Sequence, residues 1–463
     1  MKFLLMGLVG LISLPILAIF VAHPSRTLLP LYAGTLPIAS VISLSLPLPP
    51  PFNTLSSLLG ALMIVAGLTH VIIYRRGRIP SVPVAIWLLF LGWATLTSFW
   101  AIKVADATST ILVAVPLLLL MVVVALLEVD EEDFDVLRVA LIAGSALVGM
   151  WAAYLLLSGR ALPAHGVSER FSVTSNPDTT NPNILAVSLL LPLALAVHMM
   201  VFGGKRWWSE RTWRLIGIWG SVFTVIAIVL TSSRGGMMAA AAVFVICLLY
   251  CARDPRDRSR TVRTAGGILV ATMAIGVFIV VSLAISPSGG FVRRILSSGP
   301  FERIAQRQTD SSGRLEIWTA GLLACETYCE KGAGFGNFEN AYAQVYALSA
   351  ASENVGASRP AHNVYLGMVV ETGFLGLSLL GLALASEWYL VSSRQMRKFE
   401  PALKAGIIGL LIASIFLSAI WFKYFWLVFA LIRAAESATD PQAAIRRSSP
   451  PLVPAISASA YRA

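Results

Sequence analysis

A histidine and an amide open one late apolar run of the chain, where an aqueous substrate would meet a membrane. His362 and Asn363 follow a long polar segment and begin the apolar run 363–391. A neutral imidazole, with an ordinary pKa near ~6.5, is a suitable proton acceptor near neutral pH. Glu371 lies inside the same run, where a carboxylate by default belongs to a site or a polar network. Taken alone, however, a histidine at a helix start is more often structural than catalytic.

Arg234 stands between two apolar runs, in the turn Ser233-Arg-Gly235. An arginine at membrane depth is costly unless it meets an anion or a water-filled cavity. Two interpretations stay open. The arginine either marks a helix end at the membrane surface, or it forms an anion clamp. In the clamp, Gly235 and Gly236 would let a ligand approach the backbone, and the following helix start would offer N–H groups to a phosphate.

Arg314 is the second arginine of interest and lies in the long polar segment before His362. Ser312 is a suitable cap for a helix that begins near Gly313, which would put Arg314 in its first turn. A cation there opposes the helix dipole unless an anion shares the site. The alternative is an ordinary solvated arginine on a helix of the loop.

The composition indicates what positions these residues. Of the 463 residues 57% are hydrophobic and only 13% are charged, with a mean hydropathy of +0.77. A soluble domain carries about a quarter charged residues, so a soluble globular protein is excluded. Runs of about 20 apolar residues can each cross the ~30 Å hydrocarbon core as a helix. Such runs lie near 3–22, 27–48, 53–74, 82–101, 108–127, 136–157, 184–202, 215–231, 237–251, 265–286, 363–391, 404–420 and 421–435.

We therefore predict an all-α polytopic membrane protein with about twelve spans. Twelve is favoured over thirteen because the run 27–48 holds Pro30, Pro37 and Pro47 and is followed by Pro49, which indicates a broken or re-entrant segment. Four basic clusters fall in loops that alternate correctly to share one side, which the positive-inside rule makes cytoplasmic. These clusters lie at 75–78, 205–214, 253–263 and 394–404. The net charge of +11 is thus explained by basic loops on the cytoplasmic side, which contact lipid, and it does not indicate a nucleic-acid partner.

The same topology predicts the domain organisation. Residues 1–286 hold transmembrane helices with a small outer loop at 158–183, which contains Arg170. Residues 287–361 form a large outer loop domain, residues 362–436 return to the membrane, and 437–463 form a Ser- and Pro-rich cytoplasmic tail that we expect to be disordered. His362, Arg234 and Arg314 all fall on the outer, periplasmic side.

Three further features of the outer segments have plain structural interpretations. Asn181-Pro-Asn183 predicts a helix start with an asparagine cap and proline just inside, and sugar binding by Asn183 would be an addition to that role. The glycine-rich run 332–336 is expected to be a turn that brings backbone close to a substrate or the membrane surface. Cys325 and Cys329 are expected as free thiols, with a disulfide as the alternative in an oxidising compartment.

These elements together resemble the O-antigen ligase and O-antigen polymerase superfamily. The family pattern is a histidine, a small polar residue, nine residues, glycine, two residues and a further glycine or equivalent at the start of a late span. His362, Asn363, Gly373 and Gly376 fit it at every position. The turn 233–235 and the segment 313–318 also resemble the family, over about 160–390. The resemblance implies a GT-C-like membrane glycosyltransferase architecture with a periplasmic helical domain.

The resemblance also implies the reaction. The donor would be a glycan on undecaprenyl pyrophosphate in the bacterial inner membrane, with no metal, cofactor or nucleotide sugar. Arg234 and Arg314 would bind the pyrophosphate, since guanidinium groups pair bidentately with phosphate oxygens, and would stabilise the leaving group. His362 would accept the proton of the acceptor hydroxyl. Substrate-binding roles are predicted for the following residues: Asn363, Gly235, Arg170, Asn183 and Glu371.

The acceptor distinguishes the remaining alternatives. A ligase, which transfers the glycan to a lipid A–core sugar in lipopolysaccharide biosynthesis, is favoured over a polymerase that extends the glycan on its carrier. A flippase is less favoured because no repeat symmetry or mid-membrane polar cluster is evident, and a non-catalytic scaffold leaves the three cationic residues unexplained. One departure concerns the last outer turn, where some ligases carry an acidic residue and this chain has Lys423 among aromatic residues.

Overall fold

The computed structural model describes residues 17–39, 41, 53–75, 77–157, 162–163, 171–172, 182–203, 208–231, 233–253, 258–263, 314–349 and 359–441. The described chain is helical apart from a two-residue antiparallel pair, β1 (Leu162–Pro163) with β2 (Phe171–Ser172). The helices of the first half are α2 (Leu28–Ala39), α3 (Leu55–Tyr74), α4 (Val82–Leu96), η1 (Thr97–Trp100), α5 (Val104–Leu126), α6 (Glu131–Leu157), α7 (Pro182–Ser188) and α8 (Leu190–Phe202). Those of the second half are α9 (Glu210–Leu230), α10 (Arg234–Cys251), α14 (Arg314–Tyr328), α15 (Phe338–Ser349), α16 (Val364–Val391), α17 (Glu400–Ser414), η2 (Ala419–Trp421) and α18 (Lys423–Ala438).

Eight helices of the described residues are long and apolar enough to cross a membrane. They match the predicted runs from 53–74 to 237–251 and the run 363–391, so the prediction of a helical, multi-pass membrane protein is confirmed. The predicted runs 404–420 and 421–435 correspond to the shorter helices α17 and α18, which are not among the eight. α2 has only 12 residues and contains Pro37, in agreement with a broken segment in the run 27–48. The run 265–286 and most of 3–22 lie outside the described residues, so twelve spans stays a prediction.

α8 is the central helix of the bundle. Residues 185–201 are all buried, and α6, α9, α10 and α17 pack around them. The predicted single helix 184–202 is divided into α7 and α8 at Leu189. Pro192 explains the division, because it has no N–H to donate to the carbonyl of Ser188 four residues earlier.

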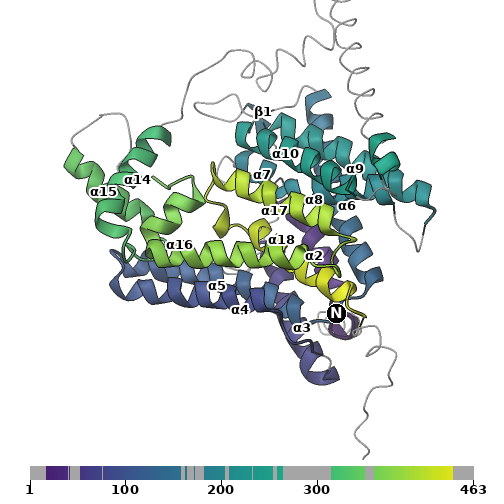
Figure 1. The fold of residues 1–463 in the computed structure, drawn as a ribbon, viewed down its shortest axis with the longest axis horizontal. Coiled ribbons are helices and arrows are strands. Elements are labelled where there is room, and N and C mark those ends of the chain that lie inside the picture. The colour runs from purple at the N-terminus through teal and green to yellow at the C-terminus, as the bar shows by residue number, and fades with distance from the viewer. Residues whose placement is uncertain are drawn as a thin grey trace, which may run out of the picture.

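The bundle has two chemically different ends. α14 and α15 project from one end, on the left of Figure 1, beside the start of α16. The basic segments gather at the other end, which we call the basic end: Arg78 pairs with Asp440 at 3.4 Å, Arg260 with Glu210 at 3.6 Å, and Lys398 with Glu131. The predicted grouping of the basic loops therefore agrees with the described structure.

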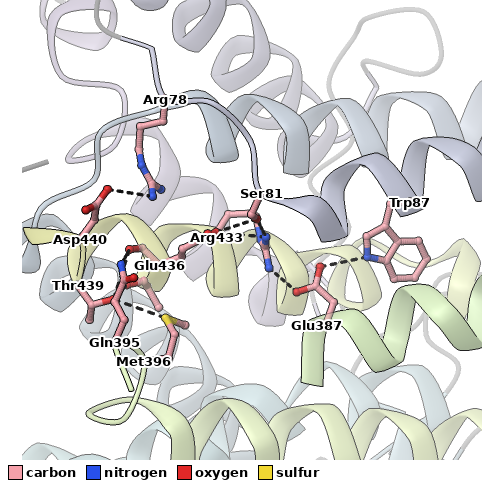
Figure 2. A network of polar contacts seen from close by, with 11 residues as sticks. Arg78, Ser81, Trp87, Glu387, Gln395, Met396, Arg433, Glu436, Thr439 and Asp440 are labelled. Atoms are coloured by element: carbon pink, nitrogen blue, oxygen red, sulfur yellow. Dashed lines mark hydrogen bonds and ion pairs between the residues drawn. The ribbon is translucent and has the colours of Figure 1, made fainter. Parts of the chain in front are cut away.

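A buried polar network ties α4, α16 and α18 together near the basic end (Figure 2). Arg433 of α18 forms ion pairs with Glu387 of α16 and with Glu436 at 3.2 Å, and it also contacts Ser81. Trp87 of α4 donates its indole N–H to Glu387 at 3.2 Å. Arg433 and Glu387 are both 0% exposed, so each charge depends on the other for compensation.

We expect Arg433→Met to lower the stability of the bundle sharply. Removing one partner of a buried ion pair costs about 3–5 kcal/mol, because the other charge stays buried without compensation. The double variant Arg433→Met/Glu387→Leu should recover most of this loss. The measurement is the apparent melting temperature of the detergent-purified protein, followed by size-exclusion chromatography after heating. A single variant as stable as the wild type would contradict the expectation.

Candidate functional site

The site end of the bundle is organised by a break in α16. Gly373 has φ 74° and ψ −179°, which is outside the helical region and strongly favours glycine. The carbonyl groups just before the break therefore lose their usual partners within the helix. Those of Val370 and Glu371 instead accept hydrogen bonds from Ala333 and Gly334 at 2.8 and 2.9 Å. Figure 1 shows α16 beside α14 and α15 at this end.

The donors belong to the glycine-rich run 332–336, which we call the glycine loop. Gly332, Gly334 and Gly336 all have positive φ, which permits the tight course of the loop. A Cβ atom on Gly332 would lie 2.4 Å from the carbonyl oxygen of Glu371, so the close approach also requires glycine. The prediction of a turn is confirmed. Its backbone meets α16, and Gly336 also lines a cavity; the expected approach to a substrate or to the membrane surface stays a prediction.

The opposite side of the glycine loop is fixed to the turn between α4 and α5. Phe335 donates its backbone N–H to Thr97 Oγ1 at 3.0 Å, and the Asn337 side chain accepts from the N–H of Lys103 at 2.9 Å. The loop thus joins α4, α5 and α16 at one point.

Glu371 is a buried member of this joint. Its carboxylate accepts the backbone N–H of Gly336 at 2.9 Å. Its carboxylate also has a hydrogen bond with the backbone of Phe338, and the side chain lines a cavity. The predicted role in substrate binding stays a prediction, and the bracing of the loop is an observed function.

His362 lies at the mouth of α16 in a constrained conformation. Its φ of 48° is in the left-handed region, which few non-glycine residues adopt. Asn363 is the N-cap of α16, and its Oδ1 accepts from the N–H of Leu366 at 3.0 Å. The amide predicted to bind substrate is therefore used as a helix cap. On one side of His362, Trp318 of α14 donates to the carbonyl of Ala361 at 3.1 Å.

The structure brings Arg314 to His362. Arg314 is the first residue of α14 and is half-buried, and burial lowers its pKa. The pKa of His362 is also lowered, first by burial and then by the positive charges of Arg314 and Arg359, against the opposing effect of Glu339. The neutral imidazole is thus favoured. The sequence analysis missed Arg359 and Glu339; the only signal for Arg359 was a basic residue three positions before His362.

A cavity of about 300 Å³ lies next to this group. It reaches from α5 across the glycine loop to Ala361 and η2, and Glu339 is shared between the cavity wall and the surroundings of His362. The wall is formed by Ser109, Thr110, Val113, Gly336, Phe338, Glu339, Pro360, Ala361, Glu371, Ser418 and Trp421. The last outer turn therefore contributes Ser418 and Trp421, whereas Lys423 is bound to Ser56 and Ser57 at 2.8 Å each.

Arg234 is the first residue of α10, at the same end of the bundle, and its side chain is exposed. Ser233 caps the helix through a hydrogen bond from Gly236 N–H at 3.1 Å. A Cβ atom on Gly235 would lie 3.0 Å from the ring of Phe416, just beyond α17. The glycine that we predicted to admit a ligand thus admits Phe416. α17 also meets α16 near His362, through the bond from Tyr365 Oη to the carbonyl of Leu411 at 3.0 Å.

The remaining sequence predictions have mixed outcomes. Arg170 and the predicted cap at Asn181 lie outside the described residues. α7 begins at Pro182 as predicted and includes Asn183 in its first turn. The expectation of free thiols at Cys325 and Cys329 is wrong: the two form a disulfide at the end of α14, with a Cα–Cα distance of 4.4 Å. The chain leaves the helix at Tyr328, so Cys329 lies closer to Cys325 than the ~6 Å of a regular helical turn.

Helices α9, α10, α14 and α16 lie in the part of the chain that is similar to a known protein family. Residues 219–381 match the family model of the O-antigen ligase. The predicted resemblance is thereby confirmed, and it supports an O-antigen ligase-like function in general. The matched segment contains Arg234, Arg314 and His362 but begins after Arg170 and Asn183. No curated protein matches the chain.

The break in α16 predicts a contrast between two glycine substitutions in that helix. Gly373→Ala should destabilise the protein and reduce activity, because its φ is positive and its Cβ would lie 2.7 Å from the carbonyl oxygen of Glu330. Gly381→Ala is the control, since nothing lies within 4 Å of its Cβ and alanine favours a helix by about 1 kcal/mol. The measurement is the melting temperature of both purified variants. Equal effects would show that the break is not required.

Proposed function

We propose that the protein is a glycosyltransferase that moves a glycan from undecaprenyl pyrophosphate to an acceptor hydroxyl at the end of the bundle that carries His362. The favoured acceptor is the lipid A–core sugar, which makes the enzyme an O-antigen ligase acting at the periplasmic face of the inner membrane. The family similarity of residues 219–381 supports this class of reaction. The same donor chemistry would serve a polymerase that extends the glycan on its carrier, and this is the second candidate.

The reaction needs one proton acceptor and one stabilised leaving group. The acceptor oxygen attacks the anomeric carbon of the donor sugar, and the bond from that carbon to the pyrophosphate oxygen breaks. His362 takes the hydroxyl proton, and undecaprenyl pyrophosphate leaves with the electron pair. Arginine forks next to the pyrophosphate would offset the charge that develops on it.

The observation that carries the proposal is the electrostatic effect of Arg314 on His362 at the start of α16. A base must be neutral before it acts, and the positive charges of Arg314 and Arg359 lower the pKa of the imidazole. The same charges attract a phosphate. One local arrangement thus favours both the proton acceptor and the anionic leaving group.

Arg234 is assigned to the far side of the donor site. It begins α10, where the positive end of the helix dipole favours a phosphate. α17 separates the start of α10 from the start of α16, so the donor pyrophosphate would lie across its C-terminal end.

Purified protein with the lipid-linked glycan and lipid A–core should form the ligated product in the presence of EDTA and without ATP. His362→Ala should lower the rate about 100-fold or more, the usual contribution of a general base. Arg314→Gln should cause a loss of similar size. His23→Ala is the matched control, because His23 is exposed and acts electrostatically on Asp133 of α6 at the basic end. Full activity of the His362 and Arg314 variants would refute the assignment.

Two charge variants should move the pH profile in opposite directions. Activity should fall as His362 becomes protonated, on an acidic limb below the ordinary histidine pKa of about 6.5. Arg359→Gln removes a positive charge, which raises the pKa of His362 and shifts the limb to higher pH. Glu339→Gln removes a negative charge and shifts it to lower pH. The measurement is kcat/KM against pH; a limb that stays in place in both variants would exclude His362 as the titrating group.

The acceptor separates the two candidate functions. Supplying lipid-linked repeat units alone and resolving the products by chain length tests for polymerisation. We expect chain growth to be absent and transfer to occur only when lipid A–core is added. Chain growth without that acceptor would favour the polymerase.

A further inference from the structure

A second polar cavity lies at the basic end of the bundle, opposite the candidate site. Its volume is about 630 Å³, within the usual range of small-molecule sites. It opens among the start of α6, the ends of α8 and α10, and the segment that leads into α17. None of the residues assigned to glycan transfer lines it.

The wall of this cavity carries more basic than acidic side chains, although Arg260 and Lys398 also pair with Glu210 and Glu131, which lie outside it. Two acidic side chains also line it, but both are already neutralised: Asp135 pairs with Arg138, and Glu400 pairs with Lys404 at 2.6 Å. The basic residues of the wall come from four separate segments of the chain, which the fold brings together. They are Arg138, Arg253, Arg260, Arg397 and Lys398.

Arg138 is the residue that points to a ligand. It is 1% exposed, and its Nη2 is held by Asp135. Its Nε and Nη1 atoms have no hydrogen-bond partner among the described residues. Leaving buried donors unsatisfied is costly, and the cost is larger for a charged group. The guanidinium is held between the rings of Phe134 and Phe399, 5.8 and 5.2 Å from their centroids, so it is fixed in this position.

His198 offers a further buried nitrogen on the same wall. Its Nε2 lies 2.8 Å from the carbonyl oxygen of Lys398, and its Nδ1 has no partner among the described residues. Because a carbonyl oxygen only accepts, Nε2 carries the proton and Nδ1 is left as an acceptor, which fits a hydroxyl or P–OH group of a ligand and leaves the anionic oxygens to the arginines.

We propose that this cavity binds a phosphate-bearing anion. Several guanidinium groups around one cavity favour a ligand with many oxygen acceptors, and phosphate fits bidentate pairing better than a single carboxylate does. Two sources share this chemistry: the headgroup of an anionic phospholipid, and a soluble phosphate compound. Basic pockets between transmembrane helices are known to bind anionic headgroups, and this one lies at the helix ends, where headgroups are found. The site does not depend on the proposed transferase reaction.

The test uses the full-length protein and two probes. Inorganic pyrophosphate is added to detergent-purified protein, and its binding is measured by calorimetry. Separately, the protein is placed in nanodiscs of phosphatidylcholine with or without phosphatidylglycerol, and the phospholipid that it retains is counted by native mass spectrometry. Arg253→Gln and Arg397→Gln change exposed wall residues, which reduces the danger of unfolding. Arg394→Gln is the matched control: it is exposed in the same segment as Arg397 but lies outside the cavity wall.

We expect the two wall variants to weaken binding about tenfold or more, and the control to leave it unchanged, because each lost charge-assisted hydrogen bond contributes at this scale. Selective loss of phosphatidylglycerol identifies the headgroup as the source. Selective loss of pyrophosphate binding identifies a soluble phosphate. If neither probe binds, or if Arg394→Gln weakens binding as much as the wall variants, the proposal is wrong.

Discussion

The site end depends on the break in α16 at Gly373. Backbone carbonyls at membrane depth must be satisfied within the protein, so a broken helix requires donors from elsewhere. The glycine loop supplies them through Ala333 and Gly334, and Trp93 donates to the carbonyl of Thr372 at 2.8 Å. Because the loop connects α14 to α15, this requirement also fixes both helices. The contact of Trp318 with Ala361 then places Arg314 beside His362.

The family-like pattern around His362 thus combines two kinds of residue. Asn363 and the two glycines build the helix: the amide caps it, Gly373 breaks it, and a Cβ on Gly376 would lie 2.0 Å from Thr372 Oγ1. His362 is the exception, because it precedes the helix and makes no contribution to its hydrogen bonds. Its left-handed backbone conformation is held by the elements on both sides, which is typical of residues kept for a function.

The sequence alone predicted those elements that depend on residues close together in the chain. Apolar runs defined the spans, Pro182 marked the start of α7, and Ser233-Arg234 marked the start of α10. The sequence did not predict contacts between residues that are distant in the chain. The glycines of the glycine loop predicted a turn. They did not indicate that the turn would donate hydrogen bonds to carbonyl groups of α16. Arg359 and Glu339 likewise act on His362 only because the loop domain folds back onto the start of that helix.

The buried arginines differ in how many of their nitrogen atoms have hydrogen-bond partners, and this difference indicates different roles. Arg433 uses its terminal nitrogens on Glu387, Ser81 and Glu436, so it is close to satisfied within the protein and serves to join helices (Figure 2). Arg138 is as deeply buried, yet two of its three nitrogens lack partners in the described chain. Arg314, in contrast, is half-buried and begins a helix, where a transient anion can reach it. Among the described residues Arg433 leaves only its Nε without a partner, whereas Arg138 leaves both Nε and Nη1, and this difference supports a joining role for Arg433 and the proposed anion site at Arg138.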